Sequence, residues 1–435
     1  KAIDNYYGST EEAAERFIQD VTECEIEIEV DDGSGADADV EEHDDSPIIR
    51  LVSLIIIEAY KTGASDIHLE PLEKRFRVRY RIDGVLVEQD APPKYLQNNL
   101  LQRCKIMASL DIAERRVPQD GRIMFRVPKG SIDLRVSSVP TVHGESIVMR
   151  ILDKSSVQLG IPELGFFHDD QELINRIIYL PDGIFLVTGP TGSGKTTSLY
   201  AFLNTLNTPN RKIITAEDPV EYELSGINQV QCDPAIDMTF DRALRAMLRQ
   251  APNIVMVGEI RDMSTGAVAI NAALTGHLVF STLHTNDAPT AVTRLIDMGL
   301  KPFLVASGVR AVMAQRLVRT ICKQCARPTT ATAEELESLG LPPDYFKDAN
   351  LQEGIGCNEC TKGFKGRLGI FEIFAVEDTL VQMILDNEPT HIIRNQAVEL
   401  GMRSLRDDAL RKAGNGITTL AEVMRVTKAA EEEEV

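Results

Sequence analysis

The sequence lacks any uninterrupted run of the ~20 apolar residues that a membrane-spanning helix needs. Its best candidate, Ile48 to Ala59, is broken by Arg50 and Glu58 and is typical of a buried helix. The start of the chain also lacks a signal-peptide pattern. It has no initiator methionine, so the sequence can be a piece of a longer protein. These absences predict a cytoplasmic protein.

The sequence also lacks a concentrated basic stripe, although its net charge of −20 is large. Thirteen acids and no Lys or Arg lie between Asp20 and Asp45, and Glu431 to Glu434 add four more. Without those seventeen acids the net charge is about −3, so the folded part is nearly neutral. The acidic runs are typical of solvated linkers and tails. An acidic chain of this kind does not favour nucleic-acid binding.

The length of 435 residues predicts two or three domains, and we find no internal repeats. Residues 1–30 hold a short amphipathic helix (Thr10 to Asp20) and an alternating segment (Cys24 to Val30), which we interpret as the remnant of an N-terminal domain. Residues 31–45 are predicted to be an acidic flexible linker. We place a second domain at 46–155 and a third at 156–435.

The second domain has the pattern of an α+β fold. It begins with Ser46-Pro47, an N-cap followed by proline at the first helical position, and this helix is expected to stop at Gly63. Short alternating segments and one helical stretch follow: strands Phe76 to Gly84, Ser131 to Val139 and Ile147 to Leu152, with a helix at Tyr95 to Ile112.

From Gly160 onward, fully apolar segments alternate with helical ones. Apolar strands of this kind are typical of a mostly parallel sheet that is covered on both faces, so the third domain is predicted to be α/β. Helices within Thr379 to Lys412 and Leu420 to Ala429 are expected to close the chain.

The strongest motif is a phosphate-binding P-loop, which follows a predicted strand (Ile184 to Thr188) and precedes a predicted helix (Thr197 to Leu206). Its glycines let backbone N–H groups surround phosphates, Lys195 supplies a positive charge, and the Thr196 hydroxyl can ligate Mg²⁺. An unrelated glycine-rich turn is the weaker interpretation. The predicted nucleotide-binding residues are Gly189, Pro190, Thr191, Gly192, Ser193, Gly194, Lys195, Thr196 and Thr197.

Two acidic strand ends accompany the P-loop. The apolar segment Ile254 to Gly258 leads to Glu259, an atypical Walker B strand with glycine where many P-loop proteins have aspartate. Glu259 is our candidate for activating the attacking water, against the alternative of a solvated acid. Glu217 and Asp218 follow another apolar strand, where parallel sheets place phosphates and metals.

Two histidines flank one further strand, within the segment Thr275 to Asn286. A single histidine is more often a packing or surface residue. Because His277 and His284 stand at the two ends of one strand, we favour a γ-phosphate-sensing role for the pair.

These four clusters, in this order and spacing, resemble the type II secretion and type IV pilus-assembly ATPases, with Walker A, Asp box, atypical Walker B and His box. The resemblance extends from Ser46 onward, and MAQRLVR (Met313 to Arg319) also fits the family. GASDIHLEP (Gly63 to Pro71) and RVPQDGRI (Arg116 to Ile123) resemble the family's PAS-like second N-terminal domain.

The resemblance implies an α/β RecA-like P-loop core preceded by an α+β PAS-like domain, with ATP bound between the two. It implies a homo-hexameric motor on the inner face of the bacterial inner membrane. The motor would meet the membrane only through a platform protein and associated assembly proteins, without nucleic acid. By motif position, the arginines expected to reach the phosphates are Arg135, Arg150, Arg245 and Arg249. On their own, such arginines are more often surface or ion-pairing residues.

Four of the seven cysteines form two C-x-x-C pairs, which in a cytosolic chain indicate a metal site before disulfides. Four thiolates can hold one tetrahedral Zn²⁺, with no open position for water, so a structural role is expected. The pairs lie in an insertion at about 320–362 that carries a predicted small helix (Thr332 to Leu339). Reduced, metal-free thiols are the alternative. The proposed ligands are Cys322, Cys325, Cys357 and Cys360.

Two other functions fit the same motifs. A RecA-like nucleic-acid translocase or helicase would need a basic channel, for which the sequence gives little sign. A scaffold that binds ATP without turning it over would need a defective Lys195 or Glu259, and both are present. Small-molecule kinase activity is less favoured because no second substrate pocket is indicated. The sequence does not separate the secretion branch from the pilus-assembly branch.

Overall fold

The computed structural model of the chain describes residues 47–127, 130–152 and 160–432. The chain divides into two compact units, Lys1–Ser155 and Ser156–Val435, and each is described by itself. The expected helix at Thr10 to Asp20, the segment Cys24 to Val30 and the linker 31–45 lie outside the described residues.

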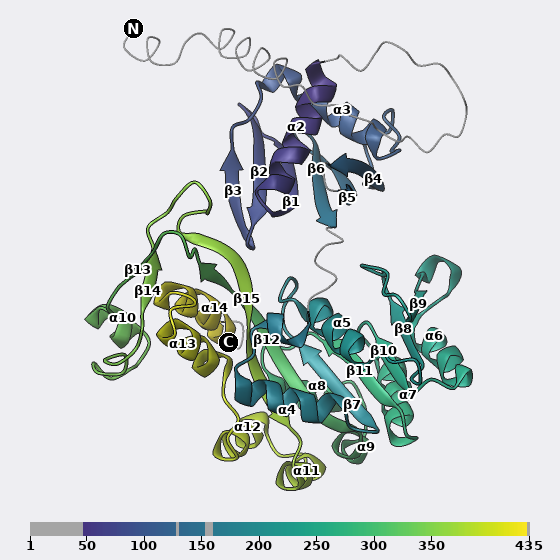
Figure 1. Cartoon of the computed structure of the whole chain (residues 1–435). Coiled ribbons are helices and arrows are strands. Elements are labelled where there is room, and N and C mark those ends of the chain that lie inside the picture. Colours follow the sequence, from purple (N-terminus) through teal and green to yellow (C-terminus); the bar gives the residue numbers. More distant parts are fainter. Residues whose placement is uncertain (1–46, 128–129, 153–159, 433–435) are drawn as a thin grey trace. The chain divides into compact units, whose positions relative to one another are not determined.

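The first unit contains a six-stranded antiparallel sheet with two helices packed against it (Figure 1). The strand order is β3-β2-β1-β6-β5-β4. Inward-facing residues of the alternating strands form one core with the helices, which confirms the expected α+β pattern. The elements are α2 (Pro47–Lys61), β1 (Ala64–Pro71), β2 (Phe76–Ile82), β3 (Val85–Gln89), α3 (Gln97–Met107), β4 (Gln119–Val127), β5 (Gly130–Thr141) and β6 (Gly144–Leu152).

The second unit is built on a seven-stranded sheet with the order β15-β12-β7-β11-β10-β8-β9. All neighbouring strands are parallel except β12 and β15, which form a long antiparallel pair at one edge. The strands are β7 (Gly183–Thr188), β8 (Ile213–Glu217), β9 (Asn228–Gln231), β10 (Ile254–Val257), β11 (Leu278–Leu283), β12 (Val309–Ile321) and β15 (Phe364–Ala375).

Each face of this sheet has its own hydrophobic core, because successive strand residues point to opposite sides. In β10, Ile254 and Met256 pack with α4 and α5 on one face, whereas Val255 and Val257 pack with α7 and α8 on the other. The prediction of a mostly parallel sheet covered on both faces is thus confirmed. The helices on the sheet are α4 (His168–Ile178), α5 (Lys195–Leu206), α6 (Phe240–Met247), α7 (Met263–Leu274), α8 (Ala288–Asp297) and α9 (Pro302–Gly308).

The closing helical stretch is divided into short helices rather than continuous. Asn387 and Gly401 have positive φ values (+55° and +102°) and Pro389 precedes α12, so the chain turns twice within Thr379 to Lys412. The closing helices are α11 (Asp378–Leu385), α12 (Thr390–Glu399), α13 (Leu405–Gly414) and α14 (Leu420–Glu432).

A small excursion connects the long strand β12 to the edge strand β15 in the sequence. It consists of β13 (Ala326–Pro328), α10 (Ala333–Ser338) and β14 (Gln352–Gly354), with β13 and β14 paired antiparallel. The predicted helix is present as α10, and Thr332 and Glu335 form a capping box at its start.

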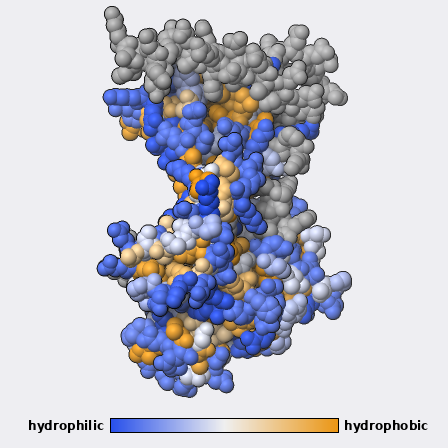
Figure 2. Space-filling view, turned by 60° about the vertical axis from the view of Figure 1, so that its left-hand side comes forward, coloured by the Kyte–Doolittle hydropathy of each residue, from blue (hydrophilic) through white to orange (hydrophobic). Residues whose placement is uncertain are grey.

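The surface is mixed in character. Figure 2 shows hydrophilic residues over much of the displayed face, with hydrophobic residues in separate patches among them. Among the described residues, no helix is both long enough and apolar enough to cross a membrane.

Candidate functional site

The phosphate loop joins the end of β7 to the start of α5, the context that its motif requires. Gly189, Gly192 and Gly194 all have positive φ values, and a Cβ atom on Gly189 would lie 2.4 Å from the Gln315 carbonyl oxygen. No side chain caps the N-terminus of α5. The first N–H groups of this helix are therefore available to an anion, and this donor set fits phosphates.

Lys195, the first residue of α5, folds back over the loop. Its Nζ atom donates hydrogen bonds to the carbonyl oxygens of Gly189 (2.8 Å) and Pro190 (3.0 Å). Burial lowers the pKa of Lys195, and the nearby charge of Glu259 opposes this effect. The lysine thus brings a partly desolvated positive charge to the mouth of the loop.

A cavity of about 160 Å³ opens beside the loop, at the carboxyl ends of the parallel strands. This is the edge of an α/β sheet where ligands are expected. The cavity brings together the four motifs that the sequence suggested, from the loop, β8, β10 and β11. Its lining is Lys195, Thr196, Leu199, Glu217, Asp218, Pro219, Glu221, Phe240, Met256, Gly258, Glu259, Thr282 and His284.

Glu259 follows β10 and lies between two basic side chains. The Nε2 atom of His284 lies 3.1 Å from Oε2 of Glu259, and Arg261 forms an ion pair with Oε1. Burial opposes ionisation of Glu259, but Arg261 and His284 outweigh it and hold the pKa of this carboxyl below its ordinary value. Glu259 is therefore ionised at neutral pH and able to accept a proton.

Gly258 stands where many P-loop proteins have aspartate, and its surroundings explain the small residue. A Cβ atom at this position would lie 3.3 Å from both the Phe240 ring and the Ala216 carbonyl oxygen. The Gly258 carbonyl accepts a hydrogen bond of 2.7 Å from the Thr282 hydroxyl, which ties β10 to β11 beside the cavity.

Glu217 lines the same cavity but is held by other side chains. Its Oε1 atom accepts hydrogen bonds from Thr215 (2.5 Å) and from the Gln229 amide (3.0 Å), and its Oε2 atom accepts one from the Tyr200 hydroxyl. Sequence reasoning did not identify Tyr200 or Gln229. Both stand inside apolar or strand-like segments and carry no motif.

His277 lies at the opposite edge of the sheet from His284. It precedes β11 and its carbonyl accepts a hydrogen bond from the Gly183 N–H at the start of β7, whereas the phosphate loop follows the end of β7. The six residues of β11 lie between the two histidines, and the seven residue steps from His277 to His284 span roughly 23 Å at ~3.3 Å per residue. The structure thus brings His284, but not His277, to Lys195.

The four candidate arginines are divided between the two units. Arg245 and Arg249 are exposed on and after α6, where Arg249 donates to the Arg245 carbonyl oxygen. Arg135 and Arg150 belong to the first unit and stand directly opposite each other on β5 and β6. Arg122, which sequence reasoning missed, is the next residue in this row, on β4.

The row of arginines has a physical consequence. Like charges directly opposite each other on neighbouring strands destabilise a sheet. Asp66 compensates one end of the row, where its carboxylate contacts Arg150 (3.1 Å) and Arg81 (3.2 Å). Guanidinium groups in such a row match the oxygens of an anion such as a phosphate.

The four cysteines of the C-x-x-C pairs come together beside β13 and β14. All four sulfur atoms lie within 4.8 Å of one another, with Cys322–Cys357, Cys325–Cys360 and Cys357–Cys360 separations of 3.9, 3.7 and 3.6 Å. A tetrahedral Zn²⁺ with Zn–S bonds of about 2.3 Å requires sulfur separations of about 3.8 Å. The donor set therefore fits zinc, and the distances are too long for disulfides.

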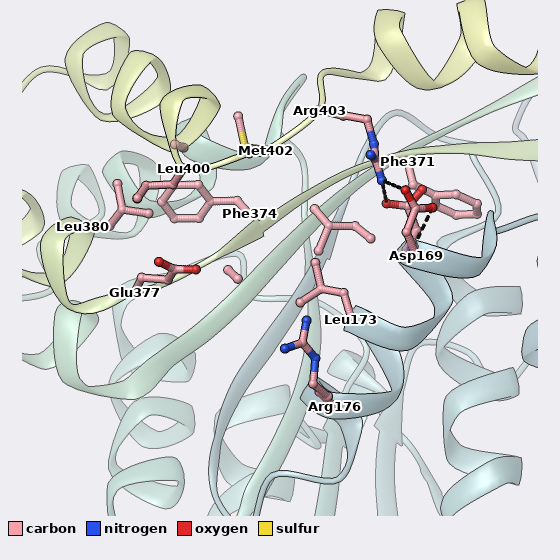
Figure 3. A pocket seen from close by; sticks show the side chains of 15 residues that line it. Asp169, Leu173, Arg176, Phe371, Phe374, Glu377, Leu380, Leu400, Met402 and Arg403 are labelled. Atoms are coloured by element: carbon pink, nitrogen blue, oxygen red, sulfur yellow. Dashed lines mark hydrogen bonds and ion pairs between the residues drawn. The ribbon is translucent and has the colours of Figure 1, made fainter.

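A second cavity, of about 220 Å³, lies between α4, β15 and the closing helices, and no motif residue lines it. Figure 3 shows Arg403 pointing toward Asp169 of α4, beside Phe371. Arg403 pairs with Asp169 (2.5 Å) and Asp170 (2.7 Å), and Arg411 of α13 lies 3.2 Å from Asp169. We interpret this cavity as the junction that holds the closing helices on the sheet.

The fold and the nucleotide cavity define the class: a P-loop nucleoside triphosphatase with an acidic catalytic candidate opposite its lysine. The sequence profile of the Type II/IV secretion system protein family matches residues 41–425, and the chain belongs to that family. This confirms the family to which the sequence motifs pointed.

Individual relatives agree with this assignment. The chain is 47% identical to the type IV pilus assembly ATPase PilB of Myxococcus xanthus over 98% of its own length and 75% of the relative. It is 50% identical to the type II secretion system ATPase E of Vibrio cholerae over 89% of its own length and 77% of that relative. The chain is therefore an ATPase of this family, and the two branches match it about equally.

Solved structures support the fold. The ATPase DotB of Yersinia pseudotuberculosis superimposes with a TM-score of 0.65 at 21% identity, covering 89% of this chain and 94% of the other. These comparisons give no support to the alternative of a nucleic-acid translocase or helicase.

Proposed function

We propose that the chain is the ATP-driven motor of a type II secretion or type IV pilus-assembly machine. The observation that carries the proposal is the convergence of Lys195, Glu259 and His284 on one cavity at the phosphate loop, in a chain whose relatives are named as such ATPases. The motor acts as a homo-hexamer on the cytoplasmic face of the bacterial inner membrane. It drives a platform protein with its associated assembly proteins, without nucleic acid.

In this mechanism the loop amides and Lys195 hold the triphosphate. Thr196 and the carboxylate of Asp218, which line the same cavity, would hold Mg²⁺. When bound, this ion neutralises charge on the phosphate oxygens. The ionised Glu259 accepts a proton from the attacking water, a contribution of roughly 10²–10⁴ in rate. His284 contacts Glu259 and reports the γ-phosphate.

We further propose that the first unit serves as the family's PAS-like domain. Its opposed arginines Arg135 and Arg150, together with Arg245 and Arg249 of the second unit, supply positive charge to the phosphates. The register that places Arg122, Arg135 and Arg150 side by side supports this role, because guanidinium groups match the oxygens of a phosphate. An arginine finger that completes such a site can be worth roughly 10³–10⁵ in rate.

The tetracysteine cluster serves as a structural Zn²⁺ site. Cys322, Cys325, Cys357 and Cys360 provide four thiolates at separations that fit one tetrahedral ion. These four cysteines would hold the ion between β12 and β15, where it would stabilise the excursion and take no part in phosphate chemistry.

ATP turnover per subunit, measured against protein concentration with and without DNA, tests the proposed function. Turnover that rises as oligomers form, without an effect of DNA, is expected from sites completed by ring assembly. Turnover independent of concentration would show that each subunit is catalytically complete. Strong stimulation by DNA would replace the proposal with a translocase.

A further inference from the structure

Two side chains outside the nucleotide cavity contact the Glu217 carboxylate that lines it. Tyr200 lies on α5, one helix residue beyond Leu199 of the lining, and Gln229 lies on the edge strand β9. Neither belongs to the lining, yet both bond directly to Glu217. The carboxylate therefore joins the phosphate-loop helix to two strands of the sheet.

The convergence follows from the local fold. Thr215 and Glu217 are two residues apart on β8, so their side chains share one face. Gln229 stands opposite Thr215 in the parallel ladder between β8 and β9. The helix α5 covers this same face and brings the Tyr200 hydroxyl to Glu217.

The hydrogen bonds form a closed network. Gln229 donates to the Glu217 carboxylate at 3.0 Å and to the Tyr222 carbonyl oxygen at 2.9 Å, and its Nε2 atom also lies 3.4 Å from the Tyr200 hydroxyl oxygen. The side-chain oxygen of Gln229, Oε1, accepts a hydrogen bond from the Leu224 N–H at 2.6 Å, which fixes the orientation of the amide. Because Tyr200 and Glu217 are each only 4% exposed, water cannot replace these partners freely.

The hydrogen bonds to Glu217 leave one acceptor position of its carboxylate unfilled. An ionised carboxylate offers about four acceptor positions on its two oxygens. Thr215 and Gln229 fill the two positions on Oε1, and Tyr200 fills one on Oε2. Burial and the charge of Glu217 raise the pKa of Tyr200, so its hydroxyl stays protonated and remains a donor. One acceptor position of Oε2 remains for a donor from the cavity.

We infer that Tyr200 and Gln229 are positioning residues for Glu217, and that they aim its remaining acceptor position at the hydration shell of nucleotide-bound Mg²⁺. This inference rests on the proposed ATPase site. Magnesium keeps several of its waters in such sites, and these waters are hydrogen-bond donors. Glu217 then holds a water of the shell, beside Thr196 and Asp218, and its orientation depends on side chains that never touch the nucleotide.

The test is the Mg²⁺ dependence of nucleotide binding in Tyr200→Phe, with the full chain. Binding of a fluorescent ATP analogue is titrated at increasing free Mg²⁺ and in EDTA. Loss of the hydroxyl frees the carboxylate to rotate, so half-maximal Mg²⁺-dependent binding should need roughly fivefold more Mg²⁺. Affinity in EDTA should stay within about twofold of the original, since Lys195 and the loop amides are unchanged.

A second variant and a control variant separate an effect on the Mg²⁺ dependence from a loss of stability. Gln229→Met removes the amide from another element and should shift the Mg²⁺ dependence in the same direction. Thr205→Val removes a hydroxyl from the same helix, where it bonds the Ala201 carbonyl oxygen at 2.8 Å, and should leave the Mg²⁺ dependence unchanged. Thermal unfolding of all three variants shows how far each one is destabilised.

The outcomes separate the inference from the proposed function. If Tyr200→Phe and Gln229→Met lower the melting temperature but leave the Mg²⁺ dependence unchanged, Glu217 is only a structural tie and the inference is wrong. An equal loss of affinity with and without Mg²⁺ would also overturn it. If the unmodified chain shows no Mg²⁺-dependent ATP binding, the proposed function itself fails.

Discussion

The Nε2 atom of His284 lies 3.1 Å from the Oε2 atom of Glu259, across the gap between the ends of β11 and β10. Arg261 holds the other oxygen of the same carboxylate. Both oxygens of the candidate base are therefore engaged by basic groups, which keep it ionised. To accept a proton from water, Glu259 has to exchange one of these partners for that water. The histidine contact offers a physical route by which the state of the phosphate reaches the base.

Replacing Glu259 by glutamine should separate binding from hydrolysis. The amide keeps the size of the side chain but cannot accept the proton, so turnover should fall by at least ~10²-fold. ATP affinity should persist, because Lys195 and the loop amides remain. Turnover is measured by phosphate release and affinity by fluorescent-nucleotide titration. Unchanged turnover in Glu259→Gln would remove this residue from the role of base.

The two histidines make a matched pair for mutagenesis. His284→Gln should lower turnover at least ~10-fold, because the contact with Glu259 at the cavity is lost. His277→Gln, at the other end of the same strand, should keep turnover within about twofold of the original. The two steady-state rates are compared after a check that melting temperatures agree. Equal losses in both variants would contradict the assignment of the sensing role to His284 alone.

Arg261→Ala should shift the pH dependence of turnover. A general base is active only when ionised, so the rate falls as pH decreases through its pKa. Arg261 and His284 together hold the pKa of Glu259 below its ordinary value despite burial. Removing the guanidinium should raise that pKa, so the acidic limb of the pH–rate profile should move to higher pH.

The control for this prediction is Arg242→Ala, an exposed arginine of α6 that pairs with Asp237 at 2.6 Å. It should leave the pH–rate profile in place. An acidic limb that stays unmoved in Arg261→Ala would mean that another group controls it.

Sequence reasoning located the cavity because of a geometric rule. The carboxyl ends of parallel strands collect at one edge of a sheet, so acids that follow apolar strands and the P-loop had to meet. Lys195, Glu217, Glu259 and His284 all line the cavity for this reason. His277 does not line the cavity, because it precedes β11 and thus lies at the amino ends of the parallel strands.

What the sequence could not predict depends on side-chain contacts between elements. Tyr200 and Gln229 resemble ordinary helix and strand residues until β8, β9 and α5 are packed together. The row of Arg122, Arg135 and Arg150 arises from the register between β4, β5 and β6. This register cannot be read from any one segment of the sequence. The breaks in the closing helices depend on positive-φ residues such as Asn387, which leave little trace in an apolar periodicity.

The proposed zinc site at the four cysteines predicts a local effect of metal loss. Cys322→Ser removes one of four thiolates, so bound zinc should fall well below one per chain, and the excursion at 320–362 should lose order. Elemental analysis measures the metal and hydrogen exchange measures the order. Cys232→Ser, a buried cysteine outside the cluster, should retain the metal. Order in the excursion that survives complete metal removal would count against a structural zinc.

An ion-pair cluster ties α14 to β12 and predicts an acid-sensitive contribution to stability. Glu422 lies 2.6 Å from Arg319 and 2.7 Å from Arg425. Burial alone would raise its pKa, but the two guanidinium groups lower the pKa of Glu422 to about 2. Because the folded pKa lies below the ordinary value, the stabilisation is complete above that value and is lost as pH falls toward 2.

Glu422→Gln should therefore lower the free energy of unfolding by about 2 kcal/mol at pH 7, with both arginines left partly buried without a counter-charge. Below about pH 4.5 the difference from the original chain should narrow, because protonation removes the same charge there. Urea unfolding at a series of pH values measures this difference in the free energy of unfolding. Glu359→Gln, from the exposed pair with Lys365 at 3.1 Å, should cost less than about 0.5 kcal/mol throughout. A difference that stays constant down to pH 3 would show that Glu422 acts through packing and not through its charge.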